Sequence, residues 1–88
     1  MSKPKEGKDT EKIVSMLEVM SQDTSIPRNV RLQLQEAEKK LRSSDDFDVA
    51  VSSAIYILDD ISNDINLPMH ARTMIWNLMS ELEMLKGG

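Results

Sequence analysis

Two stretches of the chain, SQDTSIPRNVR at residues 21–31 and SNDINLPMHAR at residues 62–72, repeat one pattern at an interval of 41 residues. Ser, Asp, Pro and Arg occupy the same places in both, and an apolar residue precedes each Pro. Proline disfavours helical backbone in the residue before it and is tolerated in the first turn of a helix. Each stretch therefore predicts a helix end, a tight turn and a new helix start.

Apolar residues on either side of these stretches recur at steps of three and four, which is the spacing of one face of an α-helix. Four such stripes are present. They comprise Ile13, Val14, Leu17 and Met20; Val30, Leu34, Ala37 and Leu41; Phe47, Ala50, Val51, Ala54, Ile57, Leu58 and Ile61; and Leu67, Ala71, Met74, Ile75, Leu78, Leu82 and Leu85. Alternating apolar and polar runs and Asn-Gly turns, the signals of strands and hairpins, are absent from the sequence.

The predicted fold is all-α: a four-helix bundle made of two sequence-related helical hairpins, over about residues 10–42 and 46–86, with a flexible tail over residues 1–9. Neither hairpin can cover its own stripes, so both pack around one core. The period, the Asp in the turn and the Pro at the helix start resemble the turn motif of HEAT-type repeats. Two repeats are fewer than a free-standing solenoid needs, which favours a closed bundle over an open superhelix.

The repeated corner residues have a predicted structural role in the turns. They are Asp23, Pro27, Arg31, Asp64, Pro68 and Arg72. We predict that each arginine pairs with the aspartate of its own corner, and such exposed pairs are worth under about 1 kcal/mol. Ser25 and Asn66 are predicted to cap the helices that follow. At the joint between the hairpins, RSSDDFD (42–48), Ser44 or one of the aspartates is predicted to cap the third helix.

Charge and cysteine content narrow the class of protein. The chain has 88 residues, a net charge of −4 and no cysteine, so disulfides and cysteine-based metal sites are excluded. This composition suits a reducing cytosol. No apolar run approaches the roughly 20 residues that a membrane span needs, and the first ten residues, MSKPKEGKDT, lack the apolar stretch of a secretory signal. We therefore predict a cytoplasmic protein with no membrane partner.

The charge is unevenly distributed, because residues 43–88 carry eight acidic and two basic side chains whereas residues 13–42 are nearly balanced. Attraction between the halves, or a self-complementary dimer, would use this asymmetry. The net negative charge disfavours nonspecific phosphate binding, and one Trp, one Tyr and one Phe offer few platforms for base stacking. Nucleic-acid association is nevertheless retained as an alternative on a basic set that comprises Lys3, Lys5, Lys8, Lys12, Arg28, Arg31, Lys39, Lys40 and Arg42.

The segment ILDDISNDINLPMHARTMIWNLMSELE (57–83), together with SQDTSIPRNVR, resembles small archaeal proteins of the uncharacterised protein family UPF0147. The resemblance runs from about Glu11 to Leu85, and NLPMHARTMIWN (66–77) is its most specific part. Asp46-Phe47 stands where the family pattern has Asp-Pro, which removes one helix-start constraint. The resemblance implies an all-α four-helix fold in an archaeal cytosol. It implies no activity, and no catalytic residue is carried over.

The sequence offers little catalytic or metal-binding chemistry. His70, the only histidine, is either a ligand or general base, or a helix-start residue that hydrogen-bonds across the turn. The second interpretation is favoured, because a metal site needs three or four converging ligands. The aspartates within residues 45–48 and 59–60 lack the spacing of an EF-hand, and no nucleophile elbow or phosphate loop is present. We predict no catalytic residue, no metal site, no cofactor and no enzymatic activity.

Trp76 is the candidate functional residue that the apolar stripes leave unexplained. On the last predicted helix it points about 150° from the centre of the stripe, on a face that is solvated in a simple bundle. This face predicts a protein interface, because exposed Trp and Met are typical of interfaces. The alternative is that the last helix is central and buried on more than one side. The candidate interface residues are Leu32, Met69, Thr73, Trp76 and Met79.

These observations predict a small, non-enzymatic protein–protein interaction module that self-associates or binds another protein. Its support is the absence of catalytic motifs from the sequence and the apolar residues opposite the last stripe. Nucleic-acid association through the basic set is the alternative function.

Overall fold

Four α-helices make up the described part of the chain: α1 (Lys3–Ser21), α2 (Arg28–Ser43), α3 (Phe47–Ser62) and α4 (Met69–Gly87). The computed structural model describes residues 3–43 and 45–87. No strand occurs in these residues. The prediction of an all-α, four-helix fold is therefore confirmed.

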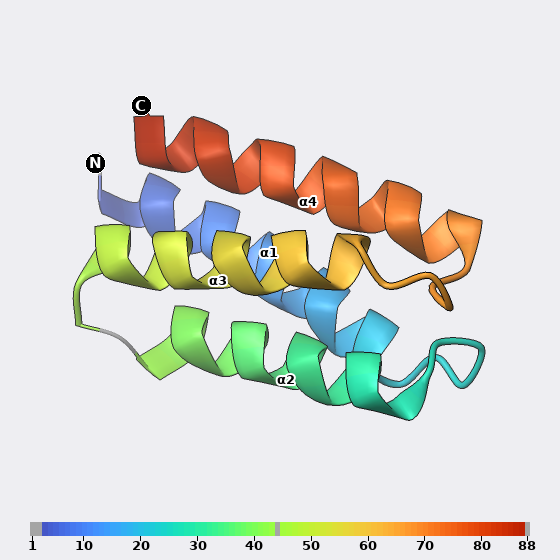
Figure 1. The fold of residues 1–88 in the computed structure, drawn as a ribbon. Coiled ribbons are helices and arrows are strands. Elements are labelled where there is room, and N and C mark those ends of the chain that lie inside the picture. Colours follow the sequence, from blue (N-terminus) through green and yellow to red (C-terminus); the bar gives the residue numbers. More distant parts are fainter. Residues whose placement is uncertain (1–2, 44, 88) are drawn as a thin grey trace.

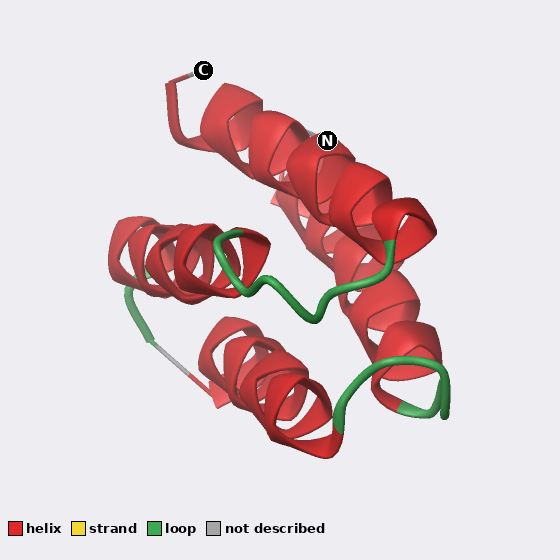
Figure 2. Cartoon of the chain, turned by 45° about the vertical axis from the view of Figure 1, so that its right-hand side comes forward, coloured by secondary structure: helices red, strands yellow, loops and turns green. Residues whose placement is uncertain are grey.

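Successive helices run antiparallel and surround one interior (Figures 1 and 2). α2 packs against α1 and α3, α3 packs against α4, and a smaller contact between α1 and α4 closes the arrangement. α2 and α4 lie on opposite sides of the interior and make no helix–helix contact (Figure 2). The two ends of the chain lie at the same end of the bundle (Figure 1). The arrangement is a closed bundle, as the small number of predicted helices favours.

One core is shared by all four helices. Leu17, Leu34, Leu58 and Leu78, one from each helix, have no exposed surface. The other residues of the four predicted stripes are buried or half-buried. Burying a leucine side chain contributes about 1.5–3 kcal/mol relative to leaving it in water. Because leucines of both hairpins belong to this one core, we expect each hairpin to depend on the other for its stability.

The first corner, between α1 and α2, is a short turn held by backbone hydrogen bonds. The Asp23 N–H donates to the carbonyl of Met20 at 3.0 Å, and the Ile26 N–H donates to the carbonyl of Asp23 at 3.1 Å. The Arg31 N–H donates to the carbonyl of Pro27 at 3.0 Å and so opens α2. Pro27 therefore occupies the N-cap position, where its missing N–H costs nothing.

The second corner repeats these bonds 41 residues later. The Asp64 N–H donates to the carbonyl of Ile61 at 2.9 Å, and the Leu67 N–H donates to the carbonyl of Asp64 at 3.2 Å. The Arg72 N–H donates to the carbonyl of Pro68 at 3.0 Å. Ile26 and Leu67, the apolar residues that precede the two prolines, are both buried. The common bonding explains why the sequence repeats here. That the hairpins are copies of one HEAT-like unit stays a prediction.

The side chains predicted to cap α2 and α4 do not do so. Ser25 donates from its N–H at 2.9 Å and from its hydroxyl at 2.7 Å to Oδ1 of Asp23. The Asn66 N–H donates to Oδ1 of Asp64 at 2.8 Å. The capping prediction is wrong because α2 and α4 begin one residue after their prolines, so Ser25 and Asn66 lie too far upstream of the first helical turn.

The corner arginines bind main-chain carbonyls. Nε of Arg31 donates to the carbonyl of Ile26 at 3.0 Å. Nε of Arg72 donates to the carbonyl of Ser62 at 3.2 Å, and its Nη2 donates to the carbonyl of Asp64 at 2.8 Å. The predicted pairing of each arginine with the carboxylate of its own corner is wrong within the described residues. Each guanidinium instead ties its helix to the segment that precedes it.

The start of α3 follows the sequence prediction. Oδ1 of Asp46 accepts a hydrogen bond from the Val49 N–H at 3.2 Å, and the Asp46 carbonyl accepts from the Ala50 N–H at 2.9 Å. A carboxylate at this position also interacts favourably with the positive end of the helix dipole. The prediction of a cap in the joint is confirmed for Asp46, whereas Ser44 lies outside the described residues.

α1 begins earlier than the sequence predicts. Residues 1–9 are the expected tail, but the helical backbone extends back to Lys3. Pro4 does not prevent this early start, because proline is tolerated in the first turn of a helix. The flexibility of the segment concerns its motion and stays a prediction.

Candidate functional site

One side of α4 projects apolar side chains into solvent. We define the outer face of α4 by the exposed residues Met69, Thr73, Trp76, Ser80 and Glu83. Met69 is 66% exposed and Trp76 is 54% exposed. The opposite side of the helix carries the buried residues Ala71, Ile75, Leu78 and Leu82. The outer face therefore faces away from the core, and the bundle leaves its Trp and Met side chains in water.

The exposure of Trp76 decides between the two interpretations of this helix. A central helix, buried on more than one side, would have enclosed the indole within its own chain. The structure instead places α4 at the edge of the bundle with Trp76 more than half exposed. Met79, one turn further along, is half-buried and packs against the core. Trp76 is thus a surface residue, and Met79 lies where the outer face meets the core.

Leu32 is not part of this surface. It is exposed on α2, but α2 and α4 make no helix–helix contact and lie on opposite sides of the interior (Figure 2). The sequence indicates correctly that Leu32 faces away from its own stripe. It does not indicate that the two helices are diagonal neighbours, so the structure does not bring Leu32 together with Met69, Thr73 and Trp76.

A second exposed apolar set lies on α3 and was not singled out from the sequence. Val49 and Tyr56 are seven residues apart, which places them on the same side of the helix, and they are 54% and 76% exposed. The seven-residue spacing outside the core stripe was the available signal. Ile65, in the second corner, is also exposed. Tyr56 is the one exposed aromatic residue besides Trp76 in the described chain.

His70 connects the two corners. Its Nε2 lies 3.3 Å from Oδ2 of Asp23, which belongs to the other hairpin. Oδ1 of the same carboxylate accepts two hydrogen bonds from Ser25. These two Ser25 bonds, above all the one from the hydroxyl, hold the pKa of Asp23 below its ordinary value of 3.8. The hydrogen bond from His70 lowers this pKa further. His70 thus bonds across the bundle, whereas the sequence predicts a bond across its own turn.

The pKa of Asp23 gives a test of this cluster. An NMR-monitored titration of its carboxyl carbon is expected to give a pKa below that of an unfolded chain. Because the ionised form is stabilised, the contribution to stability is present above the unfolded pKa and is lost as the pH falls through the folded pKa. Ser25→Ala, which removes the hydroxyl bond with the largest effect, and His70→Ala should each raise the pKa of Asp23. A pKa that stays the same in both variants would contradict the geometry.

The acidic residues that the structure describes are spread over several elements. Within residues 3–43 and 45–87, no group of three or more His, Cys, Asp and Glu side chains converges to hold a metal ion. Oδ2 of Asp60 accepts a hydrogen bond from Nε2 of Gln33 at 2.9 Å and so joins α3 to α2. This aspartate therefore has a structural partner on the neighbouring helix.

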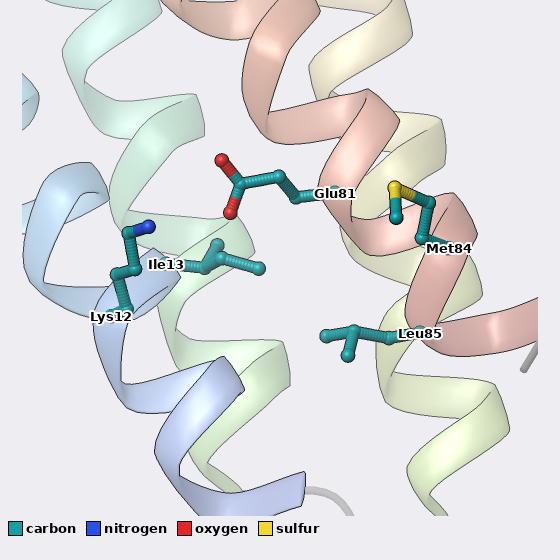
Figure 3. Close-up of a pocket in the computed structure, with 5 residues that line it drawn as sticks. All are labelled: Lys12, Ile13, Glu81, Met84 and Leu85. Carbon is teal, nitrogen blue, oxygen red and sulfur yellow. The ribbon is translucent and has the colours of Figure 1, made fainter. Parts of the chain in front are cut away.

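An open groove of about 190 Å³ lies between α1 and α4. It is lined by Lys12, Ile13, Glu81, Met84 and Leu85 (Figure 3). Figure 3 shows Lys12, from α1, and Glu81, from α4, extending toward one another, with Ile13 beside Lys12 and with Met84 and Leu85 on the α4 side. The lining residues contain no nucleophile paired with a base, so the groove offers an apolar surface with two charges at its edge.

Several of the basic residues considered for nucleic-acid binding are paired with carboxylates. Arg42 lies 3.0 Å from Glu38 and 3.8 Å from Glu18, and Lys40 lies 3.7 Å from Glu36. Arg31 is turned toward its own corner. These pairs reduce the positive potential of α2, so its surface is less suited to a phosphate backbone than the sequence suggests. Among the described helices, none is long and apolar enough to cross a membrane.

Comparison with known sequences covers nearly the whole chain. The model of the uncharacterised protein family UPF0147 matches residues 1–85. A UPF0147 protein of Archaeoglobus fulgidus is 47% identical over 76 residues, which cover 86% of this chain and 87% of the relative. A UPF0147 protein of Methanocaldococcus jannaschii is 44% identical over 75 residues, which cover 84% of this chain and 81% of the relative.

Two crystal structures have the same fold. One, of a protein from UPF0147 from Thermoplasma acidophilum, gives a TM-score of 0.85 at 31% identity and covers 91% of this chain and 95% of that chain. The other, of the protein MMP1188 of unknown function, gives 0.83 at 42% identity and covers 88% of this chain and 89% of that chain. The family resemblance seen in the sequence is confirmed. The chain belongs to the uncharacterised protein family UPF0147.

Proposed function

We propose that this protein is a non-enzymatic protein–protein interaction module that binds its partner through the outer face of α4. The observation that carries the proposal is the half-exposed Trp76 at the middle of that face. Met69, which is also exposed, lies at one end of the same face. Trp is the side chain that most often dominates binding at protein interfaces, and interfaces are enriched in Met. An indole left in water on a small monomer is explained if a protein covers it.

The local geometry also suits binding. Trp76 projects from the middle of a helix whose opposite side is fixed in the core by Ile75 and Leu78. A side chain on a rigid helix loses little freedom when a partner covers it, because its backbone is already ordered. Thr73 and Ser80, which flank it on the outer face, have small side chains. The cytoplasm is the setting that we propose for this interaction.

The alternative function, nucleic-acid association, has less support. The outer face of α4 carries no lysine or arginine, and the cations of α2 are partly paired with glutamates. The absence of enzymatic activity also forms part of the proposal. It is based on the sequence, which lacks catalytic motifs, and on the groove between α1 and α4, whose lining residues contain no nucleophile–base pair.

A photo-reactive side chain at position 76 tests the proposal. Benzoylphenylalanine in place of Trp76 keeps the position large and aromatic, and the same substitution at Tyr56 on α3 is the matched control. After irradiation of native cytosol that contains each variant, we expect protein adducts from position 76 and at least several-fold fewer from position 56.

The identity of the adduct separates the two functions. A protein adduct that depends on position 76, whether with a second copy or with another protein, supports the proposal. Equal labelling from positions 56 and 76, or nucleic acid as the main adduct of position 76, would contradict it.

A further inference from the structure

We infer that the partner of the outer face of α4 is a second copy of this chain, and that the two α4 helices pair antiparallel about a two-fold axis beside Trp76. The inference rests on the proposed function and specifies its partner. Its support is the spacing, the side-chain sizes and the charges of the exposed residues on α4.

The spacing is that of a helix-pairing seam. The exposed residues Met69, Thr73, Trp76, Ser80 and Glu83 follow one another at steps of four, three, four and three. These steps repeat every seven residues, the spacing that keeps one side of a helix against another helix. The core stripe on the opposite side already pairs α4 with its own bundle. α4 therefore carries a second seam, which the chain itself does not cover.

The side-chain sizes fit a self-complementary contact. In a two-fold interface the same patch serves both copies, so the residue on the axis meets itself. With Trp76 nearest the axis, Thr73 of one copy lies beside Ser80 of the other. These small residues leave room for each indole to lie against the partner helix. Aromatic rings in such offset contacts attract one another beyond the gain from area burial.

The charges favour the antiparallel direction. Glu83 lies near the end of α4, seven residues after Trp76, and Met69 lies at its start, seven residues before it. Antiparallel pairing places Glu83 of one copy beside the first turn of the other α4, the positive end of that helix dipole, and it also opposes the two helix dipoles favourably. Parallel pairing would place Glu83 against Glu83. Charge complementarity of this kind sets the orientation and register of an interface.

The other exposed aromatic surface is less suited to a second copy. Around Tyr56, α3 exposes the carboxylates of Asp48, Asp59 and Asp60. Two copies that paired through α3 would bring these like charges together, which costs free energy. The outer face of α4 has Glu83 as its single acidic residue. The distribution of charge thus favours α4 over α3 as the surface for self-association.

Disulfide trapping tests the pairing and its direction. The chain has no cysteine, so Thr73→Cys and Ser80→Cys each introduce a single thiol at an exposed position. In the antiparallel register, position 73 of one copy and position 80 of the other are offset by only about one residue along the helix axis. Position 73 is offset by about 9 Å along the helix axis from position 73 of the other copy. Disulfides need Cα atoms within about 7 Å.

Mixing the two variants under mild oxidation should give at least fivefold more disulfide-linked dimer than either variant alone. Tyr56→Cys, on α3, measures collisional background. Light scattering of the wild type at rising concentration should show the mass increase from 10.0 kDa toward twice that value. Trp76→Glu should weaken this association at least tenfold, and Tyr56→Glu should leave it unchanged.

Three results would overturn the inference: disulfides that form best within each single variant, association that survives Trp76→Glu, or a monomer mass at every concentration. The last result is distinguishable from failure of the proposed function. If the protein is monomeric but position 76 still photo-crosslinks to a different protein, the second copy is wrong and the interaction surface stands. If neither is observed, both proposals fail.

Discussion

Leu17→Ala and Leu58→Ala are each expected to lower the free energy of unfolding by about 2–5 kcal/mol, the range for truncating a leucine in a packed core. Both side chains have no exposed surface, and they occupy the same place in the two hairpins, 41 residues apart. A domain of this size has a total stability of about 4–13 kcal/mol. Either substitution should therefore remove a large part of it, and the two losses should be of similar size.

Urea denaturation followed by circular dichroism measures these losses. Val19→Ala is the matched control, because Val19 lies on the same helix as Leu17 but is 66% exposed. It should change the free energy of unfolding by no more than about 0.5 kcal/mol. A shared core also predicts a single transition for the whole chain. Two transitions, one weakened by each substitution, would show that the hairpins fold separately.

Arg72→Ala should destabilise the protein by about 1–2 kcal/mol, and Arg31→Ala by about half as much. Arg72 donates two hydrogen bonds to main-chain carbonyls, whereas Arg31 donates one. Both arginines are half-buried, so water can hydrogen-bond to part of the freed carbonyls in the variants. Because the two arginines occupy equivalent positions in the sequence, each serves as the control for the other.

The same denaturation measurement checks this difference, with Arg72→Lys as a further variant. Lysine keeps the charge but cannot reach two carbonyls from one planar group. It should therefore recover less than half of the loss caused by Arg72→Ala. Full recovery by lysine, or an equal loss at positions 31 and 72, would show that charge and not carbonyl bonding is what this position supplies.

The core was predictable from sequence because burial follows periodicity. Leu58 and Leu78 fall on stripes of apolar residues spaced three and four apart, and a helix buries such a stripe by turning that face toward the core. The turns were predictable in position for a similar reason, because Pro27 and Pro68 restrict the residue before them. Asp46 was among the expected caps, since a carboxylate at a helix start accepts hydrogen bonds from the free N–H groups and interacts favourably with the positive end of the helix dipole.

The side-chain bonds of the corners were not predictable from sequence. The sequence places Arg72 close to Asp64, but two groups that are close in the chain have several partners available. Which partner is bonded depends on the turn geometry, and here the carbonyl of Asp64 is bonded to Arg72 while its carboxylate is bonded to Asn66. The contact between His70 and Asp23 joins residues 47 positions apart, so it required the packing of the two hairpins.

The candidate site was predictable in part. The helical spacing placed Trp76 away from the core stripe, but the sequence alone allowed either burial between helices or exposure. That choice depends on where α4 lies in the bundle, and the structure places it at an edge, with its outer face in solvent. Leu32 was assigned to the wrong surface, because helical spacing gives the direction of a side chain from its own helix and not which helices are neighbours.

The fluorescence of Trp76 is the most direct test of the claim that a second copy covers the outer face of α4. Trp76 is the only tryptophan in the chain, so its emission reports on this face alone. As the concentration of the protein is raised, we predict that the emission shifts to shorter wavelength and that iodide quenches it less. An emission that stays that of a water-exposed indole, with unchanged quenching at every concentration, would contradict the account.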